Sequence, residues 1–154
     1  MTYAAVRVRG KININPDIKK TLKLLNLTRT NHCVILDEKA SVKGMLQVAK
    51  DYITWGEIDK KNLVELIKNR GKIQGDKEIT DAYIKSSTSY DSIEKLADAI
   101  IADKIKYKDI PNIKPIFRLN PPKKGYEGIK RTYKKNGALG YRSKDINNLI
   151  KRMI

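Results

Sequence analysis

The first third of the chain contains two kinds of hydrophobic pattern. Short stretches that are apolar throughout, or that alternate apolar and polar residues, have the period of β-strands. Between them, apolar residues recur every three or four positions with lysines off the apolar stripe, as in amphipathic helices. A β-α-β-α-β unit is therefore predicted over residues 1–58. Its elements are strands at 3–9, 33–36 and 53–58 and helices that begin near Asn15 and Ser41.

The middle third is predicted to be mainly helical. Asp59 can begin one helix, and Gly71 can close it in the left-handed conformation. Asp91 and Glu94 have the spacing of a capping box ahead of another apolar stripe. A helical extension is therefore predicted over residues 59–111.

A change of structure is predicted at residues 111–122, which hold four of the five prolines. The apolar stretch 116–119 can return to the first sheet as a strand. Residues 123–142 hold four of the nine glycines and few apolar side chains, so an extended loop is predicted there. Ser143 can then cap a last short helix.

The predicted fold class is α+β. A small β-α-β-α-β, ferredoxin-like core with a three-stranded sheet is joined to a mainly helical second part and an extended basic C-terminal segment. The predicted parts are 1–58 for the core, 59–111 for the helical extension and 112–154 for the segment that returns to the core. A chain of 154 residues can bury roughly two-thirds of the surface that its unfolded form exposes.

The positive charge of the chain is concentrated in its C-terminal third. The sequence has 33 Lys and Arg against 17 Asp and Glu, a formal charge of +16. The balance is +5 for residues 1–58 (10 basic, 5 acidic), +1 for 59–111 (11 and 10) and +10 for 112–154 (12 and 2). A surface that serves only solubility mixes both signs more evenly. The C-terminal segment therefore indicates an electrostatic footprint for a polyanion.

Several classes of function are disfavoured by the composition. A single cysteine, Cys33, forms no intrachain disulfide and no cysteine zinc cage, and a single histidine, His32, leaves little for metal or triad chemistry. No apolar run approaches the roughly 20 residues that span a membrane, and no signal sequence is recognisable. Residues 71–77 lack the spacing of a phosphate-binding loop. We expect a cytoplasmic protein with no membrane contact, cofactor, metal or small-molecule substrate.

The strongest candidate site is the stretch 118–142. It holds eight lysines and arginines, one acidic residue and three tyrosines. Cations neutralise phosphates, tyrosines stack on unpaired bases, and glycines let backbone amides approach closely. RNA is favoured over DNA because no motif would place a helix in a major groove. The predicted RNA-binding residues of this stretch are Arg118, Lys123, Lys124, Tyr126, Lys130, Arg131, Tyr133, Lys134, Lys135, Tyr141 and Arg142.

Four residues of the first third are added to the predicted RNA-binding set. Arg7 and Arg9 lie on the first predicted strand. Lys43 and Gly44 lie in the first turn of a predicted helix, which is a natural phosphate site, although Gly44 can equally serve close contact between helix and sheet. Trp55, by contrast, is expected to pack in the core rather than to stack on a base.

Five segments, in the same order along the chain, resemble one protein family. They are 42–46, 51–57, 117–122, 137–142 and 146–153. Together they resemble the universal large-subunit ribosomal protein family that is numbered thirty in bacteria and seven in eukaryotes, in its longer archaeal form. The resemblance runs from about residue 3 to the end of the chain.

The resemblance implies a structural role without catalysis. The expected fold has the sheet order three-one-two and a largely helical part that bacterial members lack. The expected partners are large-subunit ribosomal RNA and neighbouring large-subunit ribosomal proteins. Two other hypotheses stay open: a non-ribosomal RNA-binding or RNA-chaperone module, and a small phosphate-processing enzyme in which Arg7, Arg9 and Asn15 would converge on an anion.

Overall fold

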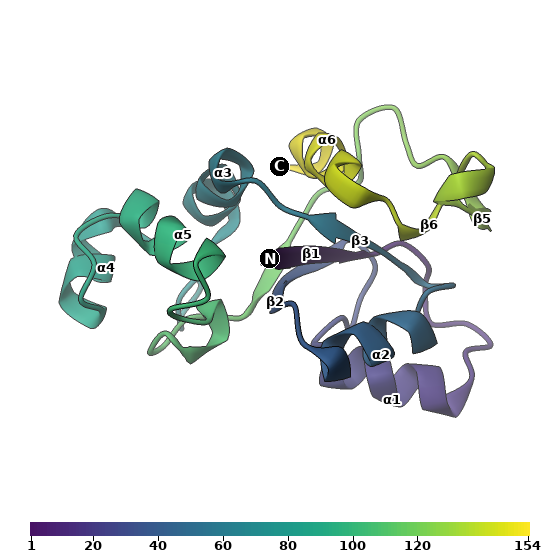
Figure 1. Cartoon of the computed structure of the whole chain (residues 1–154), viewed down its shortest axis with the longest axis horizontal. Helices are drawn as coiled ribbons and strands as arrows, with labels where there is room; N and C mark the ends of the chain where they lie inside the picture. The colour runs from purple at the N-terminus through teal and green to yellow at the C-terminus, as the bar shows by residue number, and fades with distance from the viewer.

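The computed structural model describes residues 1–154 and contains one mixed six-stranded sheet (Figure 1). Its strands are β1 (Thr2–Arg7), β2 (His32–Asp37), β3 (Ile53–Glu57), β4 (Ile116–Arg118), β5 (Gly128–Thr132) and β6 (Gly137–Tyr141). The strand order is β4-β2-β1-β3-β6-β5. β1 is antiparallel to both β2 and β3, and β4 is antiparallel to β2. β6 runs parallel to β3, and β5 runs parallel to β6.

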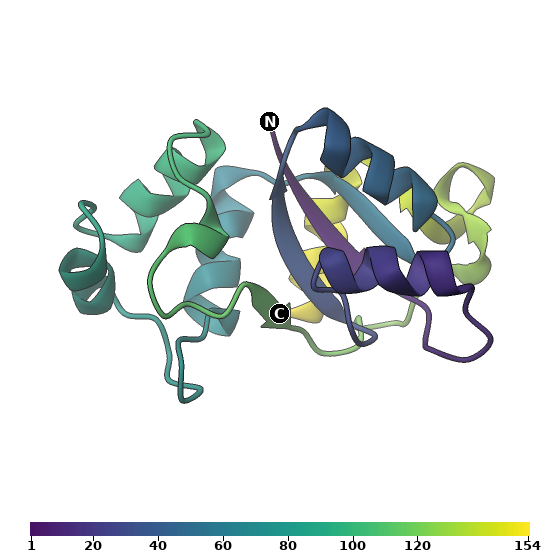
Figure 2. The same cartoon turned by 90° about the horizontal axis from the view of Figure 1, so that it is seen from below.

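Helices cover both faces of this sheet. They are α1 (Pro16–Leu24), α2 (Ala40–Val48), α3 (Lys60–Arg70), α4 (Asp81–Ser87), α5 (Ile93–Ile101) and α6 (Ile146–Met153), with 3₁₀ turns η1 (Tyr107–Asp109), η2 (Tyr133–Lys135) and η3 (Ser143–Asp145). α1 and α2 lie side by side on one face, and α3 and α6 lie on the other (Figures 1 and 2). α4 and α5 lie beyond α3, at the end of the molecule away from β5. None of the six helices combines the length and the apolar character that crossing a bilayer requires.

Each face of the sheet has its own hydrophobic core. Along β1, Ala4 and Val6 belong to one core while Tyr3 and Ala5 belong to the other, because successive side chains of a strand point to opposite faces. The first core joins the sheet to α3, α5 and α6, and the second joins it to α1 and α2. Side chains from all three thirds of the sequence therefore share the first core.

Most elements of the first third, the start of α3 and the returning strand lie where the sequence predicts them. The side chain of Asn15 caps α1 by accepting a hydrogen bond of 2.9 Å from the backbone N–H of Asp17, and α3 begins directly after Asp59. The returning strand β4 is also confirmed, because it pairs with β2. The central order β2-β1-β3 is the order that the family resemblance implies.

Two predicted serine caps are wrong. α2 begins one residue before Ser41, and its N-cap residue Lys39 makes no side-chain cap hydrogen bond. Ser143 begins the 3₁₀ turn η3, and the last helix starts only after Asp145. Neither helix start has a side-chain cap hydrogen bond, so these helices rest on the packing of their buried faces, which a capping motif does not reveal.

Two further helix ends differ from the prediction. Gly71 is extended, with φ −65°, rather than left-handed. A Cβ atom at this position would lie 2.5 Å from the carbonyl oxygen of Ile67, so the glycine serves close approach. α5 is capped by Ser92, which accepts from the backbone N–H of Lys95 at 3.3 Å, and Asp91 instead forms an ion pair of 2.8 Å with that lysine.

Residues 123–142 contain two strands and a 3₁₀ turn instead of the predicted extended loop. Gly137 lets β6 approach β5, because a Cβ there would lie 2.0 Å from the carbonyl oxygen of Arg131. Ala138 and Leu139 are buried in a small cluster with Val8. The sheet therefore has six strands, of which β1, β2 and β3 lie in residues 1–58, and the α+β class is confirmed.

Candidate nucleic-acid interface

One end of the sheet carries a dense set of free cations. Six of the predicted RNA-binding side chains are exposed and take part in no ion pair, and Glu127, the one acidic residue of the stretch 118–142, pairs with Arg142 and Arg152 instead. They lie on the loop before β5, on β5 itself and on η2. These six are Lys123, Lys124, Lys130, Arg131, Lys134 and Lys135. Because these charges are exposed and unpaired, they can attract the phosphates of a nucleic acid.

Several cations of the helical extension, residues 59–111, form ion pairs with acidic side chains. Lys60 Nζ lies 2.7 Å from Asp98, Lys95 Nζ lies 2.8 Å from Asp91, and two further pairs join Lys68 to Glu94 and Lys72 to Glu78. Exposed pairs of this kind add little stability, but they cancel the local field. The electrostatic asymmetry of the sequence is therefore also an asymmetry of the surface.

Arg142 does not belong to the exposed set. Its side chain is 3% exposed, and its Nε donates to Thr54 Oγ1 at 2.8 Å while one terminal nitrogen donates to the carbonyl of Ala138 at 2.9 Å. Glu127 lies 3.7 Å from the guanidinium, which also sits 4.9 Å from the ring centroid of Tyr133. Arg142 therefore joins β6 to β3. Its buried position does not support the predicted contact with RNA.

Arg7 is buried in the same way. It is 3% exposed, and its guanidinium donates to three backbone carbonyls, those of Leu27 at 2.7 Å, Arg9 at 2.9 Å and Gly10 at 3.1 Å. Burial lowers the pKa of Arg7, yet arginine stays charged at neutral pH. This cation organises the turn after β1 and has no free face for RNA.

The phosphate-processing hypothesis is not supported, because its three residues make other contacts in the fold. Arg7 is occupied by carbonyl groups, and Asn15 caps α1. Arg9 turns away to lie 5.0 Å from the ring centroid of Tyr52. The three side chains therefore do not form a shared anion pocket.

The two remaining surface arginines of the prediction are accessible. Arg9 is half-buried against Tyr52 and Arg118 is exposed at the end of β4, 3.9 Å from Asp76. Both retain donors that can reach a phosphate. Arg118 lies on the opposite edge strand of the sheet from β5, so the two regions do not form one patch.

A groove of about 430 Å³ lies between α2 and the β6–η2 region. It brings together four predicted residues, Lys43, Tyr133, Lys134 and Tyr141, with others that were not among the predicted RNA-binding residues. Lys43, Gln47 and Lys50 follow one another at i, i+4 and i+7, so they share one side of α2 and its end. This polar stripe was the signal in the sequence that could have identified Gln47 and Lys50.

Two tyrosines of the groove are held by their hydroxyl groups. Tyr141, 41% exposed, donates to Glu57, and Tyr133 donates to Asp145. These hydrogen bonds to carboxylates raise the pKa of both phenols, so the hydroxyls stay protonated at neutral pH. The rings therefore have fixed positions on the surface of the groove.

Trp55 forms the inner wall behind Tyr141. The two ring centroids lie 6.2 Å apart at an interplanar angle of 47°. Trp55 is only 5% exposed and belongs to the core under α2, which confirms the expectation that it packs in the core. Tyr141 covers it and presents the more accessible aromatic surface.

Lys43 and Gly44 have different surroundings at the start of α2. Lys43 Nζ lies 2.7 Å from Glu38, and the hydrogen bond with this carboxylate raises the pKa of the lysine. A Cβ at Gly44 would meet no atom within 4 Å, so Gly44 does not serve close contact between helix and sheet. Its exposed backbone leaves the phosphate-site hypothesis in place as a prediction.

Tyr126 is directed into the protein. Its hydroxyl donates to Asn31 Oδ1 at 2.6 Å and lies 3.8 Å from the sulfur of Met153. Burial raises its pKa. Because the ring fastens the loop before β5 to the core, the structure gives no support to base stacking by Tyr126.

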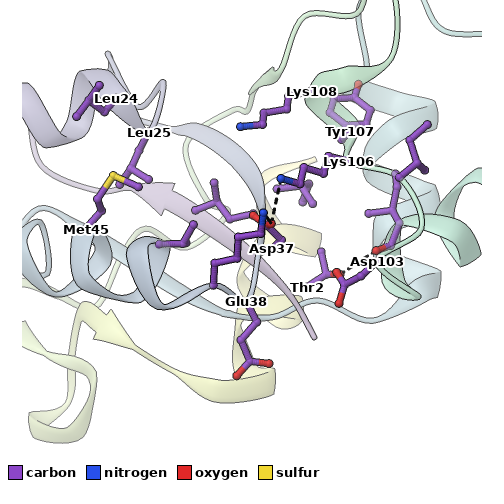
Figure 3. Close-up of a pocket in the computed structure, with 16 residues that line it drawn as sticks. Thr2, Leu24, Leu25, Asp37, Glu38, Met45, Asp103, Lys106, Tyr107 and Lys108 are labelled. Carbon is purple, nitrogen blue, oxygen red and sulfur yellow. Dashed lines mark hydrogen bonds and ion pairs between the residues drawn. The ribbon is translucent and has the colours of Figure 1, made fainter.

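A second hollow, of about 370 Å³, lies between α2 and the segment after α5 (Figure 3). Two of its lysines share one carboxylate: Asp37 Oδ2 lies 3.2 Å from Lys39 Nζ and 3.4 Å from Lys106 Nζ, while Lys108 takes part in no ion pair. Leu24 and Met45 contribute to walls that are largely aliphatic. Paired charges and aliphatic walls suit RNA less well than the lysines and tyrosines of the groove.

His32 and Cys33 begin β2 as the sequence predicts, with adjacent side chains on opposite faces. Burial, with Arg118 nearby, lowers the pKa of His32, so the ring is neutral at pH 7. Burial alone raises the pKa of Cys33 to about 12, which leaves an inaccessible thiol. The strand-entry histidine and core cysteine are confirmed, and no three His, Cys, Asp or Glu side chains gather as metal ligands would.

Comparisons with known proteins agree with the resemblance drawn from the motifs. Residues 3–53 match the family model described as ribosomal protein L30p/L7e. The large ribosomal subunit protein uL30 of Methanosphaera stadtmanae is 51% identical over 152 residues, covering 99% of both chains. The uL30 proteins of Thermoplasma volcanium (50% identity; 98% of this chain, 92% of its own) and Methanocorpusculum labreanum (46%; 98% and 99%) agree over a similar length. This chain belongs to the ribosomal protein L30p/L7e family.

Proposed function

We propose that this protein is a structural constituent of the large ribosomal subunit, in the cytoplasm, and that it binds ribosomal RNA through its basic C-terminal end. The observation that carries the site is the set of six exposed, unpaired cations on and around β5. The function follows from the family, because the relatives from Methanosphaera stadtmanae, Methanocorpusculum labreanum and Thermoplasma volcanium are named large ribosomal subunit proteins and align with almost the whole chain. The role is architectural and not catalytic.

The electrostatics of this end support binding to a folded polyanion. Each phosphate that a lysine or arginine neutralises releases condensed counterions, so log K falls by roughly 0.7–0.9 per tenfold rise in salt for each contact. Six free cations within one short stretch, with the groove lysines beside them, predict a steep salt dependence. Aromatic rings with fixed positions add stacking surface for unpaired bases.

We further propose that the three parts of the chain have different roles in the subunit. Residues 1–58 supply a ferredoxin-like frame, supported by the split arrangement in which parallel strands β2 and β3 flank β1. Residues 59–111, with a charge balance of +1, contribute shape and contacts with neighbouring ribosomal proteins. Residues 112–154, with a balance of +10, contribute most phosphate contacts.

Neutralising the exposed set tests this proposal. The variant replaces the four cations of β5 and η2, Lys130, Arg131, Lys134 and Lys135, by alanine. Its affinity for large-subunit ribosomal RNA should fall, and the slope of log K against log salt should become shallower by up to about 3.6. Cosedimentation with large subunits at raised salt should fall in parallel.

A matched control removes four exposed, unpaired lysines from the helical extension. Lys61, Lys77, Lys85 and Lys104 suit this purpose. Their replacement by alanine changes the net charge equally but should leave the slope and the cosedimentation close to wild type. Equal losses in the two variants would refute the assigned RNA-binding end. Wild-type protein found free in lysate and absent from large subunits would support the RNA-chaperone alternative.

A further inference from the structure

We propose that the groove between α2 and β6 binds one unpaired nucleotide of the RNA, with its base against Tyr141 and its phosphate between the lysines of the rim. This proposal rests on the proposed function, because it names the kind of RNA element that the basic end receives. It adds that the protein distinguishes an extruded base from a paired one.

The groove has the volume that a nucleotide site requires. Its volume of about 430 Å³ lies in the range of roughly 300–1,000 Å³ typical of sites for small molecules. A single nucleotide can enter such a hollow, whereas a duplex can only lie across its mouth. Buried Leu139 and Gly140 lie along β6 on one side, and Lys43, Gln47 and Lys50 come from α2 on the other.

The lining has the chemistry of a nucleotide site. Tyr141 exposes an aromatic face, and the hydrogen bond to Glu57 fixes its orientation. Bases of every kind stack on such a face, which makes the contact tolerant of sequence. The exposed amide of Gln47 can both donate to and accept from the edge of a base.

The rim provides cations for the phosphate. Lys50 and Lys134 stand on opposite sides of the groove, at the end of α2 and in η2, and neither takes part in an ion pair. Lys43 is held nearby by Glu38 at 2.7 Å. A phosphate that follows an inserted base would therefore meet charge on both sides. In the hollow of Figure 3, Lys39 and Lys106 already share Asp37, which leaves Lys108 as its one lysine without an ion pair.

The protein contains a reporter for occupation of this groove. Trp55 is the only tryptophan of the chain, lines the groove and lies 6.2 Å from Tyr141 between ring centroids. A base that stacks on Tyr141 should change the fluorescence of Trp55. The same base should lose its own fluorescence if it is 2-aminopurine, which is quenched by stacking.

The experiment compares two RNA hairpins of the same length, binding to the full-length protein. One carries 2-aminopurine as a single-nucleotide bulge, and the other carries it base-paired within the stem. The bulged hairpin should bind at least about fivefold more tightly, the lower end of the effect of one stacked base. On binding, the bulged hairpin should also change the emission of Trp55, and the fluorescence of its 2-aminopurine should fall. The paired hairpin should cause neither change on binding.

Variants assign this preference to the groove. Tyr141→Ala should remove the preference for the bulged hairpin, and Tyr141→Phe should restore part of it because the ring remains. Tyr83→Ala, an aromatic control on α4, should keep the full preference. Thermal melting of each variant identifies any loss that arises from unfolding.

The possible outcomes separate the two proposals. Equal affinity for the two hairpins, or equal loss on both from Tyr141→Ala, would refute the nucleotide site while leaving RNA binding intact. Failure of the wild-type protein to bind either hairpin or ribosomal RNA at low salt would instead refute the proposed function. A bulge preference that survives both Tyr141→Ala and Lys50→Ala would place the base elsewhere and would overturn the assignment.

Discussion

Arg142 should contribute to folding more than to direct RNA contact. Its guanidinium donates two hydrogen bonds in a buried position, to Thr54 Oγ1 and to the carbonyl of Ala138. Arg142→Met keeps an apolar stem of similar length but removes both donors. We therefore expect the loss of the connection between β6 and β3.

The magnitude follows from these two bonds. Hydrogen bonds with a charged partner contribute about 1.5–3 kcal/mol each. Removing a buried charge offsets part of this loss, because the charge no longer has to be desolvated. We therefore expect Arg142→Met to lower the free energy of unfolding by about 2–4 kcal/mol. For a chain of this size, each kcal/mol shifts the melting temperature by about 2–4 °C, which gives a fall of roughly 4–16 °C.

Urea denaturation of the full chain measures this effect, and Arg131→Met on β5 is the matched control. Arg131 is exposed and unpaired, so its replacement should change stability by no more than about 0.5 kcal/mol while weakening RNA binding. Arg142→Met should show the reverse pattern when binding is measured well below its melting temperature. If Arg142→Met instead unfolds like the wild type but loses RNA affinity, Arg142 contacts RNA and does not hold β6 to β3.

Three further predictions concern packing, reactivity and pH. Gly137→Ala should cost about 1–3 kcal/mol in thermal unfolding, because its Cβ would lie 2.0 Å from the carbonyl oxygen of Arg131. Cys33, whose pKa burial raises to about 12, should resist alkylation at pH 8 in the native protein and react in urea, as mass spectrometry can measure. The hydrogen bond from Lys95 lowers the pKa of Asp91, so its stabilising effect should be complete above the ordinary pKa near 4 and disappear as the pH falls through the lower folded value. Lys95→Met should abolish that shift in an NMR titration.

The first third of the fold was predictable because its local patterns coincide with its burial. The apolar run at 33–36 lies within β2, and the Asn-Pro-Asp start at 15–17 begins α1 as local capping requires. β5 and β6 were not predictable by the same means. β5 exposes most of its side chains, and β6 is short and contains two glycines. β6 pairs in parallel with β3, where Thr54 lies opposite Gly140, and β5 is joined to the sheet through β6, so pairing between residues far apart in sequence leaves no local period.

The candidate site was predictable as a region but not residue by residue. Net charge indicated a C-terminal segment in which six of the predicted cations are exposed, because charge can be summed along a sequence without knowing the fold. The sequence does not distinguish Arg131, which is exposed, from Arg142, which is buried. Nor does it place Lys50 opposite Lys134, because that proximity is created by the packing of α2 beside β6.

The two C-terminal strands should differ in how far their order depends on RNA. Fixing the backbone of each residue costs about 1–2 kcal/mol, and β6 offsets this through buried Ala138 and Leu139 and the bonds of Arg142. β5 is an edge strand with exposed cations and is attached mainly through β6. In the free protein, its amides should therefore exchange faster than those of β6, and ribosomal RNA should slow the exchange of β5 most. Equal protection of both strands without RNA would show that protein packing alone orders this end, and phosphate contacts would then bind a preformed surface.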